Sequence, residues 1–116
     1  MTSKIVNLTE KLALREITDI LADCPSDPYQ AAFSIPYLRQ LLLARVLSHV
    51  RNRYVVVQNP VEAFNDETSI SYLLEEQLHI DNLIRLYIVD ILKAYPNWQH
   101  RFGVRSRSGQ PSSWLS

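Results

Sequence analysis

The sequence contains little glycine and only one cysteine. With glycine only at positions 103 and 109, it has no glycine-rich loop to bind phosphate through backbone amides. Cys24 alone can form neither an internal disulfide nor a zinc site with cysteine partners, which suits a reducing compartment. The longest apolar-rich run, residues 83–94, is interrupted by Arg85, Asp90 and Lys93, so no segment is expected to span a membrane. We therefore expect a cytoplasmic protein.

The chain also lacks an excess of either charge. Lysine and arginine total 12, as do aspartate and glutamate, so the formal net charge is zero. A neutral chain is not expected to bind nucleic acid, which requires a basic surface. The length of 116 residues fits one domain with one core. We expect residues 1–102 to form this helical domain and residues 103–116, rich in Ser, Arg, Gly and Pro, to be a flexible tail.

Three segments have the pattern of helices: residues 8–23, residues 36–50, and a third from about 69–71 to 95. The first follows Asn7, and Glu10 lies three residues further on, which is a capping-box pattern. The second carries an apolar stripe at helical spacing. The stripe consists of Leu43, Val46, Leu47 and Val50.

Residues 54–58 are the one clear strand signal, with the sequence Tyr-Val-Val-Val-Gln. A single strand cannot satisfy its own backbone groups, so it needs a partner. The partner is either the weak strand at residues 4–6 or the same strand of a second copy about a two-fold axis, and we favour the second copy. The expected fold is mostly α, with three main helices and one short strand that a dimer partner or the N-terminal segment completes.

The last helix offers a second surface for a homodimer. Between residues 83 and 95 its apolar arc is wider than one contact face needs, so two neighbours within the protomer or a second subunit must cover it. We expect a homodimer through either the strand or this helix. The expected interface residues are Tyr54, Val55, Val56, Val57, Ile84, Tyr87, Ile88 and Ile91.

The densest group of anion-binding side chains surrounds the end of the second helix. It consists of Arg45, His49, Arg51 and Arg53, followed by Tyr54. Arginine binds phosphate through two parallel hydrogen bonds, recognises a guanine edge and stacks on a base. The group therefore favours a pocket for a phosphorylated ligand. The alternative is a polar turn beside a solvated helix face.

No pattern indicates catalysis or a metal centre. No nucleophile elbow is present, and no residue pattern marks an activated nucleophile, so we expect a protein that is not an enzyme and needs no cofactor. Glu76 and His79 have the spacing that di-iron helical proteins use, but such a site also needs inward glutamates from other helices. His49 and His100 lack a glutamate three residues before them. We therefore expect no metal site.

Residues 41–57 resemble the core of the late-competence ComFB domain family, which has the form D-V-A-A-x-A-L-N-R-L-P-P-x-Y-V. The order of two helices and a short strand, the length and the Pro-Ser-Ser-Trp ending resemble a short cyanobacterial branch. This chain has Ser48 in place of asparagine, Arg51-Asn52 in place of the two prolines, and no Cys-x-x-Cys before the helix. The matching residues are Leu42, Leu43, Ala44, Val46, Leu47, Val50, Arg53, Tyr54 and Val55.

The resemblance implies a receptor for a nucleotide second messenger. The first expectation is therefore a dimeric signalling protein that binds a cyclic dinucleotide, such as cyclic di-GMP or cyclic di-AMP, and acts on an unidentified downstream protein. Arg45, Arg51 and Arg53 would contact phosphate or guanine, and Tyr54 or His49 would line the site. The alternative is a non-enzymatic protein-interaction module without a small-molecule ligand, which would use the last helix and the tail.

Overall fold

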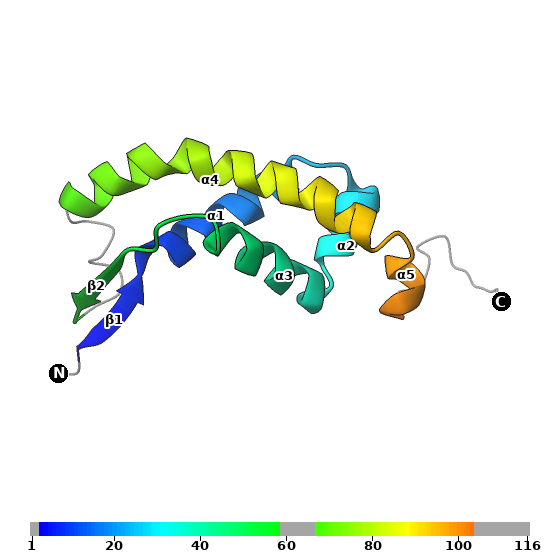
Figure 1. Cartoon of the computed structure of the whole chain (residues 1–116), viewed down its shortest axis with the longest axis horizontal. Helices are drawn as coiled ribbons and strands as arrows, with labels where there is room; N and C mark the ends of the chain where they lie inside the picture. Colours follow the sequence, from blue (N-terminus) through cyan, green and yellow to red (C-terminus); the bar gives the residue numbers. More distant parts are fainter. Residues whose placement is uncertain (1–2, 59–66, 104–116) are drawn as a thin grey trace.

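The computed structural model describes residues 3–58 and 67–103, with the backbone alone for residues 67–73. The elements in chain order are β1 (Lys4–Asn7), α1 (Leu8–Ala22), η1 (Ser26–Gln30), α2 (Ala31–Phe33), α3 (Pro36–Leu47), β2 (Tyr54–Val57), α4 (Glu67–Ala94) and α5 (Trp98–Arg101). Helix α4 lies along α1 and α3, with the two strands at one end of this helical body and α5 at the other (Figure 1). The prediction of a mostly helical chain is confirmed. Within the predicted tail, residues 104–116 lie outside the described residues.

The core lies where α1, α3 and α4 meet. Each helix contributes apolar residues at helical spacing, and α2 adds Phe33, whose side chain is completely buried. Burial of such side chains stabilises a fold by about 1.5–3 kcal/mol each. The three helices contribute Leu12, Ile17, Ile20, Leu38, Leu42, Val46, Ile80, Ile84, Ile88 and Ile91.

Part of the apolar arc of the last helix is covered within the protomer, because both α1 and α3 pack against α4, whereas Leu86 and Val89 stay exposed. Ile84 and Ile91 are completely buried and Ile88 is nearly so. Tyr87 is half-buried, and its hydroxyl lies 3.1 Å from Nε2 of His49. The prediction that Ile84, Ile88 and Ile91 form a partner interface is therefore wrong, since two neighbouring helices already cover them.

Helix α3 ends three residues earlier than predicted, at Leu47. The Ser48 hydroxyl donates a hydrogen bond to the carbonyl of Ala44, and Nδ2 of Asn52 donates one to the carbonyl of Leu47. These side chains satisfy carbonyls at the helix end, where no further turn of helix follows. In the predicted stripe, Leu43 and Val46 are buried, whereas Leu47 and Val50 are only partly buried.

The strand at Tyr54–Val57 is paired within the chain. It forms an antiparallel ribbon with β1, in which Ile5 lies opposite Val56 and Val6 opposite Val55. The N-terminal segment is therefore the partner of β2, and the expectation that a second copy supplies this partner is corrected. The reason is local: Asn7 is both the last residue of β1 and the cap of α1, so the start of α1 holds β1 beside β2.

The two faces of the ribbon differ in exposure. Val6 is buried together with Leu8, and Val55 and Val57 pack against them. The other face is exposed: Tyr54 keeps 63% of its surface accessible, and Val56 keeps 70%. Of the predicted interface residues in this strand, Val55 and Val57 thus belong to a small apolar cluster within the protomer. In the described part of the chain, no helix combines the length and the apolar character needed to cross a membrane.

Candidate functional site

The turn that carries the two arginines is fixed by the first residues of α1. The Leu8 amide donates to the carbonyl of Arg53 at 2.8 Å. The Arg53 amide donates to the hydroxyl of Thr9 at 2.9 Å, and that hydroxyl lies 3.4 Å from the carbonyl of Arg51. Thr9 itself is completely buried. The backbone of residues 51–53 is therefore held in place, which positions the side chains that project from it.

Asn52 ties this turn to the end of α3 and to the cap of α1. Its Nδ2 donates to the carbonyls of Leu47 and Val50, and its Oδ1 accepts a hydrogen bond of 3.0 Å from Nδ2 of Asn7. Oδ1 of Asn7 in turn accepts from the Glu10 amide at 3.1 Å, which confirms the predicted helix cap. The asparagine at position 52 therefore has a structural role, which a proline could not perform because it lacks the amide side chain.

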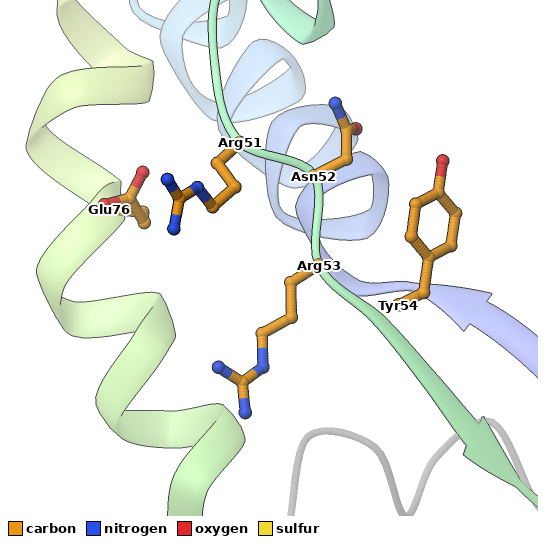
Figure 2. A pocket seen from close by; sticks show the side chains of 5 residues that line it. All are labelled: Arg51, Asn52, Arg53, Tyr54 and Glu76. Carbon is orange, nitrogen blue, oxygen red and sulfur yellow. The ribbon is translucent and has the colours of Figure 1, made fainter.

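A pocket of about 530 Å³ opens beside this turn, between the turn and α4. It is lined by Arg51, Asn52, Arg53, Tyr54 and Glu76. Figure 2 shows the guanidinium groups of Arg51 and Arg53 extending towards α4, where Arg51 faces Glu76, while the Tyr54 ring lies on the opposite side of the chain. The pocket thus combines two cationic groups and one carboxylate, while the Tyr54 ring points away from them.

The two arginines lie on the same side because they are two residues apart in a nearly extended segment. A guanidinium offers hydrogen-bond donors in a planar fork that matches two oxygens of a phosphate. Two such groups on a fixed backbone can bind one phosphate together or two neighbouring phosphates. A carboxylate opposite them accepts hydrogen bonds from the N–H groups of a ligand.

Arg45 and His49 do not line this pocket, so the predicted group of five residues is divided in the structure. Nη1 of Arg45 makes an ion pair with Oδ2 of Asp90 on α4 at 2.9 Å. Nδ1 of His49 lies 2.9 Å from the carbonyl of Arg45, and its ring packs against Tyr87. These contacts join α3 to α4, which gives both side chains a structural role on another face.

Two pocket residues, Asn52 and Glu76, were not assigned to this site from the sequence pattern, and Glu76 is the one that comes from a distant helix. Its spacing from His79 drew attention to it, but in connection with metals. Among the described residues, no group of three or more His, Cys, Asp or Glu side chains is placed to hold a metal ion. Nothing in the local sequence indicates that α4 passes beside the turn at residues 51–53. The position of Glu76 follows from the packing of α4 on α1 and α3.

A second polar cluster joins α1 and α4 close to the pocket. Glu16 is almost completely buried, and it accepts hydrogen bonds from Nε of Arg15 at 3.3 Å and from Nε2 of Gln77 at 3.1 Å. Burial opposes its charge, but its hydrogen bonds and the Arg15 charge outweigh burial, so the pKa of Glu16 is lowered. Gln77 directly follows the pocket residue Glu76 on α4.

Asp81 is the acidic neighbour of Glu16 in this cluster. Burial, followed by the hydrogen bond with Glu16 and its negative charge, raises the pKa of Asp81 to about 6. Oδ1 of Asp81 is buried with no hydrogen-bond donor near it. Two carboxylates can share a hydrogen bond only when one carries a proton, so the pair is satisfied when Asp81 is protonated.

Comparison with known proteins found no matching family model, no matching curated protein and no matching solved structure. The resemblance to ComFB proteins therefore stays a prediction from the sequence. The pocket formed by residues 51–54 and Glu76 is the feature of the described chain that suggests a ligand.

Proposed function

We propose that this protein is a regulatory receptor for a phosphate-bearing nucleotide, and that the nucleotide is cyclic di-GMP. The observation that carries the proposal is the pocket in which Arg51 and Arg53 extend from a fixed backbone towards Glu76 (Figure 2). In this proposal the protein is a homodimer without enzymatic activity. The ComFB resemblance of residues 41–57 favours the same ligand class.

The phosphates are assigned to the two arginines. A cyclic dinucleotide carries two phosphodiesters, and each offers oxygens to the planar fork of a guanidinium. Hydrogen bonds to Leu8 and Thr9 already hold the backbone of the turn, so binding does not need to order this backbone. Such preorganisation lowers the entropic cost of binding. The pocket volume of about 530 Å³ lies within the range that small-molecule sites occupy.

Glu76 favours guanine over adenine. The Watson–Crick edge of guanine presents two adjacent N–H donors, which a carboxylate can accept together. The same edge of adenine presents one donor beside an acceptor nitrogen, which a carboxylate repels. An arginine can also bind O6 and N7 of guanine. Tyr54, with 63% of its surface exposed, offers a face for stacking a base that extends across the strand.

The test is isothermal titration calorimetry of the full chain with cyclic di-GMP and with cyclic di-AMP at physiological salt. We expect binding of cyclic di-GMP, and a loss of about tenfold or more when either Arg51 or Arg53 is changed to Gln. Arg45→Gln is the matched control, because Arg45 is paired with Asp90 outside the pocket and its loss should leave the affinity unchanged. Glu76→Gln should reduce the preference for cyclic di-GMP.

Two results would overturn the proposal. One is the absence of heat with either nucleotide at high micromolar concentration, with the protein shown to be folded by circular dichroism. The other is binding that Arg45→Gln weakens and that Arg51→Gln and Arg53→Gln leave unchanged. This second result would move the ligand to the α3–α4 face, where Arg45 and His49 lie.

A further inference from the structure

A groove lies between α1 and the C-terminal half of α4. Its volume is about 440 Å³, and most of the residues that line it are apolar. Ile20 and Tyr29 line one side, Ile88 and Val89 line the other, and Cys24 lies among them. A groove of this size and character accommodates one large apolar side chain, such as an aromatic ring.

The described chain ends beside the C-terminal end of α4, close to this groove (Figure 1). Phe102 packs on Tyr95, which follows the last residue of α4, and the two ring centroids are 6.0 Å apart. Gly103 has a φ of +68°, a left-handed conformation that ends α5 and changes the direction of the chain. Arg85 is the lining residue of α4 furthest from its end, and it lies nine residues before Ala94, or about 14 Å along the helix.

The segment at residues 104–116 is long enough to reach the groove. Trp114 lies eleven residues beyond Gly103. An extended chain covers roughly 3.3 Å per residue, so Trp114 can lie up to about 36 Å from Gly103. Trp114 and Leu115 are adjacent large apolar residues, and a tryptophan side chain buries about 150–250 Å² in an apolar contact. The segment therefore offers an aromatic anchor of the kind that the groove accommodates.

The charges of this segment and of the α1 side of the groove are opposite. Residues 104–116 contain Arg105 and Arg107 and no acidic residue. Arg85 contributes one positive charge from the α4 side of the groove. Residues 19–30, on the α1 side, contain no lysine or arginine and three exposed aspartates, Asp19, Asp23 and Asp27. The C-terminal end of α1 adds the partial negative charge of its dipole, and its last turn holds no basic residue, so this side favours a basic segment.

We propose that the segment at residues 104–116 covers this groove in the same molecule, with the Trp114 ring between α1 and α4 and with Arg105 and Arg107 towards the aspartates. The inference does not rest on the proposed nucleotide binding, because the groove shares no lining residue with the pocket at residues 51–54 and Glu76. A partner protein or a small molecule then reaches the apolar lining only when the segment leaves the groove.

The first test uses Cys24, the only cysteine of the chain, as a reporter of access to the groove. Its reaction with DTNB is timed in the full chain. We expect Trp114→Gln to accelerate the reaction about fivefold, because a contact within one chain has a high effective concentration but depends here on a single anchor. Trp114→Phe keeps an apolar ring, so Cys24 should react almost as slowly as in the unchanged chain. Equal rates for Cys24 in the unchanged chain and in Trp114→Gln would overturn the proposal.

A cysteine on another surface serves as the control. In a Cys24→Ser background, Gln40→Cys places a thiol on the exposed side of α3. This thiol should react at the same rate with and without Trp114→Gln. If it accelerated as much as Cys24 does, the effect would not be local to the groove and the proposal would be wrong.

The second test observes Trp114 itself by ¹⁵N NMR of the full chain, with its indole N–H signal assigned by the loss of that signal in Trp114→Phe. We expect Val89→Asp to move this signal to the position of a solvent-exposed tryptophan, since Val89 lines the groove and keeps 46% of its surface accessible. Leu86→Asp is the matched control, because Leu86 is exposed on the same helix but does not line the groove. No shift from Val89→Asp, or equal shifts from both substitutions, would contradict the proposal.

Protein concentration separates a contact within one molecule from a contact between two. The slow reaction of Cys24 should be the same from about 5 to about 200 micromolar protein, because an intramolecular contact does not weaken on dilution. A reaction that became faster on dilution would place the segment of a second copy in the groove, and the assignment to the same molecule would then be wrong.

Discussion

The helical body buries Phe33, Leu42 and Ile84 completely, whereas the ribbon end exposes Ile5 and Val56. The body is held by apolar contacts among α1, α3 and α4. At the ribbon end, the turn at residues 51–53 is held by hydrogen bonds to Thr9 and Asn7. Apolar packing tolerates little change in volume, while a polar junction depends on individual donors and acceptors. The comparison indicates that the two ends will respond to different kinds of substitution.

The largest effect is expected in the helical body. Ile84→Ala removes a completely buried side chain and leaves a cavity, so it should lower the free energy of unfolding by about 3 kcal/mol. Val56→Ala, on the exposed face of the ribbon, should change it by about 0.5 kcal/mol or less. Urea denaturation followed by circular dichroism measures both. If both variants lowered the free energy of unfolding equally, the exposed face of the ribbon would have to be buried against another surface in solution.

A smaller effect is expected from the polar junction. Thr9→Val keeps the shape of the side chain but removes the acceptor for the Arg53 amide, so it should lower the free energy of unfolding by about 2 kcal/mol. Hydrogen exchange of the Arg53 amide should become faster. Thr18→Val is the control, because the Thr18 hydroxyl is exposed on the same helix. An unchanged exchange rate at Arg53 would mean that Thr9 does not hold the turn.

The smallest effect should come from the acidic pair Glu16 and Asp81, which joins α1 to α4 in the helical body. The raised pKa of Asp81, about 6, means that its protonated form stabilises the fold and that this contribution is lost as the pH rises from about 4 through about 6. An amide in place of this carboxyl would keep a neutral donor at every pH. Asp81→Asn should therefore stabilise the protein by about 1 kcal/mol near pH 7.5, after allowance for solvent screening, and less near pH 5.

Denaturation at several pH values measures this difference, and Glu75→Gln, which changes an exposed carboxyl on the same helix, is the control. The charged groups acting on Asp81 are Glu16 and Asp19 from α1 and Arg85 from α4. The pKa of Glu16 is lowered, so its own contribution changes only at lower pH. If Asp81→Asn raised the free energy of unfolding by the same amount from about pH 5 to about pH 7.5, Asp81 would not titrate in this range and the prediction would be wrong.

The candidate site was only partly predictable. Arg51, Arg53 and Tyr54 were identified because cationic and aromatic side chains cluster there in the sequence. Arg45 and His49 belong to the same short stretch, but they project from a different face and contact Asp90 and Tyr87. Proximity in sequence therefore predicted a ligand-binding group of five residues, of which only three line the pocket. Glu76 was not found, because a pocket wall supplied by a distant helix leaves no local pattern.

The sequence by itself determined approximately where the three main helices and the second strand lie. Helical periodicity, the cap at Asn7 and the prolines at positions 25 and 96 act locally, through backbone geometry and neighbouring hydrogen bonds, so they can be identified without a fold. Only the tertiary structure decided which surfaces meet. It paired β2 with β1 rather than leaving β2 to a second copy, buried Ile84 under α1 and α3, and brought Glu76 to the arginines. Periodicity indicates that an apolar helix face is buried, but the tertiary fold of the whole chain determines which element packs against it.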